Sequence, residues 1–174
     1  MPLYYITGVS GSGKSTVLTE LRRRGFEAYD VDDSLARWRH IRTGYIHPKS
    51  SVKKEQRTTE FLKNHRWTVP RQEVETLARQ AQTKSIFLGG SINNEDELRD
   101  LFQVVFALKI DDETIAYRLK TRTTNDWGKQ PHELQLTLAH SVATYAKYSS
   151  LGDTMLDGSQ PTEKIVDEIL ARIA

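Results

Sequence analysis

Short apolar runs alternate along the chain with longer stretches in which apolar residues recur every three or four positions. The runs are rich in β-branched and aromatic residues and predict strands, whereas the longer stretches predict helices. Five strands are predicted, over residues 3–8, 26–31, 85–91, 103–110 and 153–158. Strands that alternate with helices form a mostly parallel sheet covered on both faces. The pattern therefore predicts an α/β fold, a three-layer α/β/α sandwich around a five-stranded, mostly parallel sheet.

The helical stretches carry start and stop signals. Predicted helices cover residues 15–25, 70–82, 93–102, 111–122, 132–150 and 161–173. Gly25 stands at the end of the first of them, where glycine commonly terminates a helix. Asn94 and Glu97 have the spacing of a capping box, and Asp111 is a favourable N-cap residue for the helix that follows it.

The stretch between the second and third predicted strands is harder to assign. Residues 34–41 and 53–65 predict short helices, separated by the helix breakers Gly44 and Pro48. From residue 37 to residue 84 there are 12 Lys and Arg residues against 4 Asp and Glu residues, a local balance of +8. Such a basic segment indicates either an anionic partner or a solvated helical face.

Composition limits the class of protein. A chain of 174 residues, 37% hydrophobic and 28% charged, is expected to fold as one domain over residues 1–174. It has no cysteine, which excludes disulfides, cysteine-ligated zinc and a thiol nucleophile. No apolar run approaches the length of a membrane span, and the N-terminal residues lack the features of a signal peptide. We therefore expect a cytoplasmic protein with no membrane partner.

The loop after the first predicted strand, GVSGSGKS, matches the pattern G-x-x-x-x-G-K-[ST] at every fixed position. Its glycines allow backbone N–H groups to turn inward as an anion site at the start of the following helix. The lysine and the serine hydroxyl suit the outer phosphates and the Mg²⁺ of a nucleoside triphosphate. The residues predicted to bind the nucleotide are Gly8, Val9, Ser10, Gly11, Ser12, Gly13, Lys14, Ser15 and Thr16, with Ser15 as a Mg²⁺ ligand.

Two further strand ends carry candidate residues, because ligands bind at the carboxyl ends of strands in open α/β sheets. Asp30, Asp32 and Asp33 follow the second predicted strand, and Gly89 and Gly90 end the third. An acidic cluster this tight repels itself unless a positive group lies beside it. The lysine and metal of the phosphate loop would supply that positive charge.

In these motifs the chain resembles the P-loop small-molecule kinases, a family that includes adenylate, shikimate and gluconate kinases. The resemblance covers nearly the whole chain and rests on GVSGSGKST, YDVDD, FLGGS, RLKTR and LDGSQP. The Asn-Lys-x-Asp element of GTPases is absent, and the third predicted strand ends in glycine rather than in the acidic residue of motor ATPases. The resemblance implies a P-loop NTPase fold of the nucleoside and nucleotide kinase type.

The resemblance also implies roles for single residues. Asp30 would hold the water shell of Mg²⁺, and Asp32 would accept a hydrogen bond from the acceptor hydroxyl. Arg118 and Arg122, in a short lid over residues 118–131, would clamp the phosphates and cover the adenine. The loop on the adenine side would contain Gly158, Ser159 and Pro161. An acceptor-binding, helical segment over residues 34–84 and the nearby strand ends would supply Asp32, Asp33, Trp38, Arg42, Gly89 and Gly90.

Several of these residues have a plainer explanation as well. Asp33 suits a helix N-cap, and Asp32 could serve the same purpose on the surface. Arg118 and Arg122 could be solvated arginines paired with nearby acids, and Trp38 could be a buried anchor, as most tryptophans are. A simple turn from strand to helix would account for residues 158–161.

Together these observations predict an ATP- and Mg²⁺-dependent phosphotransferase with Lys14, Asp32, Arg118 and Arg122 as catalytic residues. The expected acceptor is a small anionic or hydroxylated molecule: a nucleoside, nucleotide or sugar-like metabolite. The protein is expected to be a monomer or a homodimer. Two alternatives stay open: a kinase that acts on a polynucleotide end through the basic segment, and a regulatory nucleotide-binding ATPase without a small-molecule acceptor.

Overall fold

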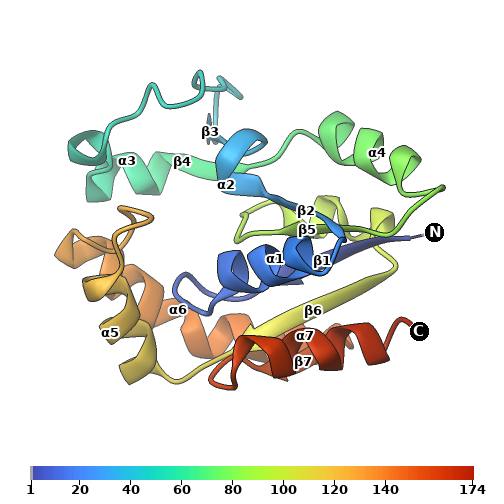
Figure 1. The fold of residues 1–174 in the computed structure, drawn as a ribbon. Helices are drawn as coiled ribbons and strands as arrows, with labels where there is room; N and C mark the ends of the chain where they lie inside the picture. Colours follow the sequence, from blue (N-terminus) through green and yellow to red (C-terminus); the bar gives the residue numbers. More distant parts are fainter. Residues whose placement is uncertain (1) are drawn as a thin grey trace.

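The computed structural model describes residues 2–174, apart from the side chain of Ser34. A five-stranded sheet forms its centre, with every neighbouring pair of strands parallel and the order β2-β5-β1-β6-β7 (Figure 1). The strands are β1 (Leu3–Thr7), β2 (Glu27–Asp30), β5 (Ile86–Gly89), β6 (Val104–Lys109) and β7 (Thr154–Asp157). The five predicted strands are confirmed, each somewhat shorter than its apolar run.

Helices cover both faces of the sheet and make the predicted three layers. They are α1 (Lys14–Arg23), α4 (Arg71–Gln80), α5 (Asp112–Thr121), α6 (Pro131–Ser150) and α7 (Thr162–Ala171). Side chains alternate between the faces along a strand, so Tyr4 and Ile6 of β1 pack with α1 and α7. Leu3 and Tyr5 point to the other face and pack with α4. Each such buried side chain stabilises the fold by roughly 1.5–3 kcal/mol.

Helices α5 and α6 extend the second face beside the carboxyl end of β6. Ile115 and Leu119 of α5 pack with Tyr145 and Tyr148 of α6 in one apolar cluster. Both chain termini lie at the end of the molecule away from α3 and α5 (Figure 1). Among the helices of residues 2–174, none combines the length and the apolar character that a membrane span needs.

The two predicted helix signals after α1 and before α5 are confirmed. Gly25 follows the C-cap of α1 with φ +88°, a left-handed conformation that glycine adopts without strain. The Asp111 side chain accepts a hydrogen bond from the backbone N–H of Thr114, at 2.7 Å. These signals are local, so the sequence alone could identify them.

The segment between β2 and β5 differs from its prediction. Its elements are α2 (Val31–Ser34), β3 (Arg37–His40), the 3₁₀ turn η1 (Lys54–Gln56), α3 (Thr59–Asn64) and β4 (His65–Thr68). The predicted helix over residues 34–41 is wrong, because β3 forms there and pairs antiparallel with β4. Trp38 lies directly opposite Trp67 in this hairpin. Such cross-strand aromatic pairs stabilise a strand, and the partner is too far along the chain for a local pattern to reveal it. The segment is therefore part hairpin, not helical throughout.

Two other predicted helices are only partly formed. The helix over residues 53–65 is confined to η1 and α3, since Thr58 caps α3 by accepting from the backbone N–H of Phe61. Residues 93–102 form two 3₁₀ turns, η2 (Glu95–Glu97) and η3 (Arg99–Leu101), without the predicted capping box. The Asn94 amide instead bonds both the backbone N–H and the carbonyl of Val69, at 3.1 and 2.9 Å. Because it is engaged in this tertiary contact, the Asn94 side chain does not cap η2.

The glycine pair at the end of β5 is explained by close packing. A Cβ on Gly90 would lie 2.0 Å from Cγ2 of the fully buried Val31, and one on Gly89 would lie 2.7 Å from Cδ1 of Leu18. Neither glycine is among the residues that line the central cavity. The structure thus supplies a steric reason for both glycines that is independent of a ligand.

Gly90→Ala is expected to lower the free energy of unfolding by roughly 1–3 kcal/mol, the usual cost of overpacking a core. Urea unfolding would measure this loss. The control is a double-mutant cycle with Val31→Ala, which removes the opposing methyl groups. The double variant should be more stable than the sum of the single losses implies. Additive losses would contradict the proposed steric clash.

Candidate active site

The phosphate loop joins β1 to α1 in a tight turn around its glycines. Gly8, Gly11 and Gly13 have φ of +138°, +90° and +105°, which L side chains rarely adopt. At Gly8 a Cβ would also lie 2.6 Å from the carbonyl oxygen of Leu108. Three positions of the motif therefore require glycine in this structure for steric reasons.

The N-terminus of α1 offers donors for an anion. Among the residues that the structure describes, the backbone N–H groups of Gly13, Lys14 and Ser15 have no hydrogen-bond acceptor. Together with the helix dipole, such free N–H groups form a phosphate site. The Lys14 ammonium lies inside the loop and donates to the carbonyl oxygens of Gly8 and Val9, at 2.9 Å each. Its positive charge is thus held inside the loop.

Desolvation lowers the pKa of Lys14 to about 8, and the nearby charges of Asp32 and Asp30 oppose that shift. Burial disfavours the ammonium form, whereas negative groups favour it. A bound triphosphate would add further negative charge at the same point. Such a ligand would therefore favour the charged form of Lys14.

The end of β2 lies next to the start of α1. The Ser15 hydroxyl donates to Oδ2 of Asp30 at 2.6 Å, and Oδ1 of Asp30 accepts from the backbone N–H of Asp32 at 3.0 Å. Asp30 is thereby the N-cap of α2, so the cap expected at Asp33 is wrong. A hydroxyl and a carboxylate oxygen are the donors that Mg²⁺ takes from a protein when phosphates and water complete its shell. Ser15 and Asp30 thus fit a Mg²⁺ ion that accompanies a nucleotide.

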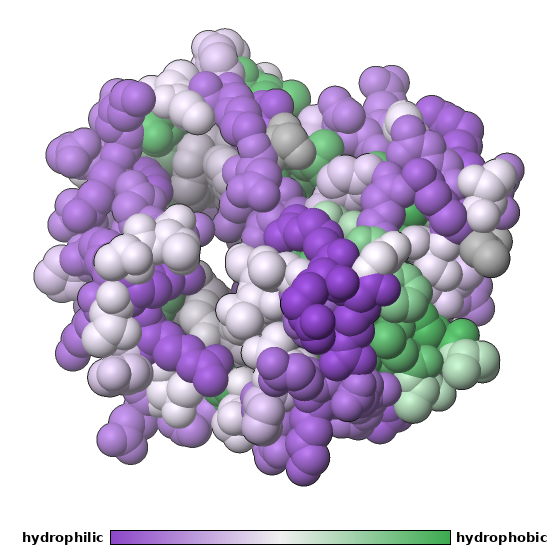
Figure 2. Space-filling view, viewed as in Figure 1, coloured by the Kyte–Doolittle hydropathy of each residue, from purple (hydrophilic) through white to green (hydrophobic). Residues whose placement is uncertain are grey.

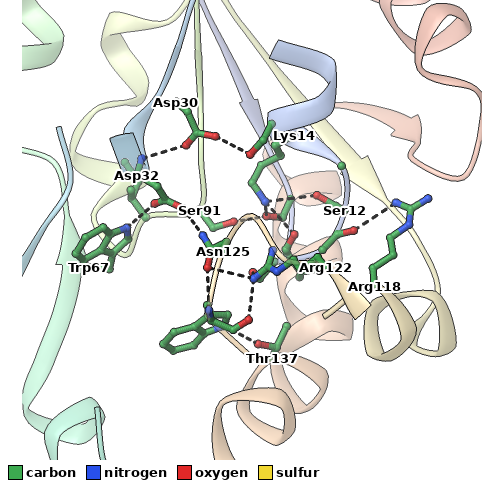
Figure 3. Close-up of a pocket in the computed structure, with 18 of the residues that line it drawn as sticks. Ser12, Lys14, Asp30, Asp32, Trp67, Ser91, Arg118, Arg122, Asn125 and Thr137 are labelled. Carbon is green, nitrogen blue, oxygen red and sulfur yellow. Dashed lines mark hydrogen bonds between the residues drawn. The ribbon is translucent and has the colours of Figure 1, made fainter. Parts of the chain in front are cut away.

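Asp32 lies in the cavity beside the phosphate loop (Figure 3). Its Oδ1 accepts a 2.8 Å hydrogen bond from the indole Nε1–H of Trp67, and its Oδ2 accepts a longer one, 3.4 Å, from the side-chain amide of Asn125. The side chain is exposed to the open cavity, although the protein groups around it partly desolvate the carboxylate. Burial and the charge of Asp30 therefore raise the pKa of Asp32, while the Trp67 hydrogen bond and the charge of Lys14 oppose the rise.

The two predicted lid arginines make different contacts. Arg118 donates to the carbonyl oxygens of Gly11 and Gly158, at 3.3 to 3.4 Å. Arg122, the C-cap of α5, donates to Oγ of Ser10 at 3.2 Å and to the carbonyl oxygen of Trp127 at 2.8 Å. In Figure 3 Arg122 points toward the Asp32 side of the phosphate loop and Arg118 lies on the other side. Both guanidinium groups thus contact the phosphate loop at adjacent residues, and the clamp expected of them stays a prediction.

The lid is also tied to the segment that carries the hairpin. Arg57 makes ion pairs with Asp126 and with the fully buried Glu133, at 3.0 and 2.8 Å. Glu133 also accepts from the backbone N–H of Gly128 at 2.8 Å. Removal of one partner of such a buried pair leaves an uncompensated charge, which commonly costs about 3–5 kcal/mol. These contacts hold the lid across the cavity.

One open cavity joins these groups. It has a volume of about 1800 Å³ and extends from the phosphate loop to the hairpin and the lid. Figure 2 shows the surface hollowed at this place, with mostly hydrophilic residues around the opening. Since single-ligand pockets measure about 300–1,000 Å³, this cavity has room for a nucleotide and a second molecule.

Most of the predicted site residues line this cavity. They are Gly8, Val9, Ser10, Gly11, Ser12, Gly13, Lys14, Ser15, Thr16, Asp30, Asp32, Asp33, Trp38, Arg118, Arg122 and Gly158. Arg42, Ser159 and Pro161 are not among the lining residues. Ser159 instead donates its backbone N–H and hydroxyl to Asp157, and Pro161 is the N-cap of α7. Ser159 and Pro161 thus belong to a turn from strand β7 to helix α7, as the plainer explanation of residues 158–161 predicted.

Several cavity residues did not emerge from the sequence. Asn125 accepts from the backbone N–H of Trp127 and from Arg122 while its amide donates to Asp32, so it connects the lid to the carboxylate (Figure 3). Ser91 donates to the carbonyl oxygen of Gly8 at 2.5 Å. The only signal in the sequence was the position of Asn125 in a short polar lid, which by itself identifies no contact.

Comparisons with known proteins agree with this fold. A protein-family model described as an AAA domain matches residues 5–136. The curated proteins include no significant match to this sequence.

Solved structures show the same fold. A sugar kinase from Janibacter sp. HTCC2649 has a TM-score of 0.60 and 21% sequence identity, over 99% of this chain and 94% of that chain. The shikimate kinase from Acinetobacter baumannii, in complex with shikimate, has a TM-score of 0.63 and 16% identity, over 99% and 93%. The deoxyadenosine kinase from M. mycoides with bound dATP has a TM-score of 0.57 and 14% identity, over 98% of both chains. At these identities the likeness shows the fold, which is that of the P-loop kinases.

Proposed function

Because the chain belongs to the AAA domain family, whose model spans the phosphate loop, the α2 carboxylates and the lid, we propose that it is an ATP- and Mg²⁺-dependent kinase of a small molecule. The observation that carries the proposal is the position of Asp32. This carboxylate lies in the same cavity as Lys14, and the two charges influence each other's pKa. A site that only binds nucleotide has no need of a second carboxylate beside the phosphates, in addition to the Asp30 carboxylate that would serve Mg²⁺.

The proposed reaction transfers the γ-phosphoryl group to a hydroxyl of the acceptor. Asp32 orients that hydroxyl and takes its proton as the oxygen–phosphorus bond forms. The bond from the γ-phosphorus to the bridging oxygen breaks, and ADP leaves with its electron pair. Lys14, the loop N–H groups and Arg122 neutralise the charge on the phosphoryl oxygens. Mg²⁺, held through Ser15 and Asp30, would supply further charge neutralisation when bound.

Arg122→Ala is expected to lower kcat by about 10²-fold, because Arg122 lies next to the phosphate loop on the Asp32 side. Arg118→Ala should instead raise the KM for ATP by about tenfold with little change in kcat, because Arg118 bridges Gly11 and Gly158 on the other side. Steady-state kinetics with varied ATP would measure both. Equal effects on the same constant would contradict the separate positions.

The direct test is a panel of metabolites incubated with ATP and Mg²⁺, with ADP release and product mass as readouts. The panel contains nucleosides, nucleotides, sugars and sugar acids, as well as an oligonucleotide with a free 5′ hydroxyl. The proposal is supported if the mass of a product equals the mass of one of the small acceptors plus a phosphoryl group. Phosphorylation of the oligonucleotide alone, or ADP release without any phosphorylated product, would overturn it.

A further inference from the structure

All three tryptophans of the chain line the same cavity. The sequence contains Trp38, Trp67 and Trp127 and no other tryptophan. They come from β3, from β4 and from the lid, and each is partly exposed at the cavity. Tryptophans in an ordinary core are largely buried. The hairpin accounts for the contact between Trp38 and Trp67, but not for the exposure of all three rings in one cavity, which leaves ring surface free to contact a ligand.

The three indoles are neighbours and form what we term the tryptophan wall. The ring centroids of Trp38 and Trp67 are 5.1 Å apart, and those of Trp38 and Trp127 are 6.3 Å apart. Phe61 supports Trp38 from α3 with a T-shaped contact at 5.3 Å. Separate segments thus hold the wall in place: the hairpin, α3 and the lid.

The wall adjoins the proposed catalytic carboxylate. Trp67 donates its indole N–H to Asp32 (Figure 3), and Trp127 donates its own to Oγ1 of Thr137 at 3.1 Å. The polar atoms of these two indoles are therefore already engaged within the protein. What the wall offers to a second molecule is apolar ring surface next to Asp32.

We propose, on the basis of the kinase function above, that the acceptor is a hydroxyl compound with a planar aromatic ring, of the nucleoside class. Its ring stacks on the tryptophan wall while a hydroxyl of its sugar reaches Asp32. Stacking on an aromatic side chain is favourable for every nucleobase, because each has a π-face.

An open-chain or alicyclic polyol fits the wall less well. Such a molecule carries several hydroxyl groups, and each one loses water when it is buried against an indole. Two of the three indole N–H groups, those of Trp67 and Trp127, are already bonded to Asp32 and Thr137, so the ring surfaces of the wall offer few partners to such hydroxyls. Unpaired buried hydroxyls are costly, so the wall discriminates against sugar acids and in favour of flat rings.

The test of the ring preference is a binding titration followed by intrinsic tryptophan fluorescence. The full chain is saturated with ADP and Mg²⁺ so that the nucleotide site is occupied, and adenosine, cytidine and thymidine are then compared with gluconate and shikimate. Because every tryptophan lies at the cavity, stacking of a base should quench most of the emission. Saturable quenching by at least one nucleoside and by neither polyol supports the proposal. Binding of gluconate or shikimate as tight as that of every nucleoside would overturn it.

Variants of the wall identify the place of binding. Trp38→Leu should raise the Kd of the nucleoside about tenfold, which corresponds to about 1.4 kcal/mol, and Trp38→Phe should restore much of the affinity. ADP should bind both variants as it binds the natural protein, which also shows that they fold. Tyr45→Leu is the matched control, since Tyr45 is an exposed aromatic residue of the same segment that does not line the cavity. Unchanged affinity in Trp38→Leu, or an equal loss in Tyr45→Leu, would overturn the proposal.

The outcomes separate this inference from the proposed function. Nucleoside binding without phosphoryl transfer would support the nucleoside as ligand and contradict the kinase function. If the protein phosphorylates a polyol and Trp38→Leu does not change that activity, the kinase function is supported and the proposed acceptor class is contradicted.

Discussion

Lys14→Ala is expected to reduce kcat by about 10³-fold or more while the fold stays intact. The Lys14 ammonium donates to two carbonyl oxygens of its own loop, so its loss removes a charge from the phosphate site without opening the core. A lost charge in a preorganised site of this kind commonly costs several kcal/mol in the transition state. Single-turnover measurements with saturating ATP would isolate the chemical step.

Lys164→Ala is the matched control for that variant, because Lys164 is an exposed lysine of α7 outside the cavity. It should retain full activity. Circular dichroism and the unfolding midpoint should be the same for both variants and the natural protein. Activity of Lys14→Ala within tenfold of the natural level would contradict the assigned role.

The charge of Lys14 also predicts a pH dependence. Since its pKa in the free protein is lowered to about 8, the ammonium is deprotonated as the pH rises through that value. The kcat/KM for ATP should therefore fall above about pH 8, because this constant reports groups of the free enzyme. A kcat/KM that stays flat from pH 7 to pH 9 would argue against a requirement for the charged lysine.

Asp32→Asn is expected to lower kcat by about 10²- to 10⁴-fold and to change ATP affinity little. The amide keeps the shape of the side chain but cannot take the proton of the acceptor hydroxyl. Asp32 contacts Trp67 and Asn125 and makes no hydrogen bond to the phosphate loop, so nucleotide binding should persist. Kinetics with the acceptor from the metabolite panel and ATP binding by calorimetry would separate the two effects.

The matched control for this variant is Asp167→Asn, on the exposed surface where Asp167 pairs with Arg24. It should leave kcat unchanged. Full activity of Asp32→Asn with the true acceptor would contradict a catalytic role for Asp32.

The acid side of the pH profile tests the same residue. Burial and the charge of Asp30 raise the pKa of Asp32, so its carboxylate is protonated at a higher pH than that of an ordinary aspartate. Because the base must be ionised, activity should fall as the pH drops through this raised pKa. The profile of Asp32→Asn should lack that step, which a merely structural role of Asp32 would not explain.

The order of strands and helices and the phosphate loop could be predicted because their signals are local. Gly8, Gly11 and Gly13 are required by the backbone conformation of one short turn, and the periodicity of the flanking strand and helix surrounds them. Parallel strands alternating with helices then bring their carboxyl ends together, so Asp30 and Asp32 were expected near Lys14. Packing of this kind is dictated by hydrophobic pattern, which a sequence displays directly.

Other features depend on contacts between distant parts of the chain. Strand β3 exists because Trp38 meets Trp67, and the cap expected at Asn94 is lost because that side chain bonds to Val69. Arg118 and Arg122 have the spacing of a pair on one helical face, yet outside the phosphate loop they bond to different segments, Arg118 to Gly158 and Arg122 to Trp127. Local propensities are weak compared with these tertiary contacts, so the sequence pattern alone predicts them poorly.

The sequence by itself determined the strands, the glycine turn and the expected clustering of lysine and carboxylates, since each follows from local patterns and from the way parallel strands bring their carboxyl ends together. Only the tertiary structure decided what surrounds Asp32, because Trp67 and Asn125 reach it from segments 35 and 93 residues away. It also decided that the three tryptophans form one wall. The nature of the acceptor depends on that wall, and side chains brought together from β3, β4 and the lid form it only once the chain has folded.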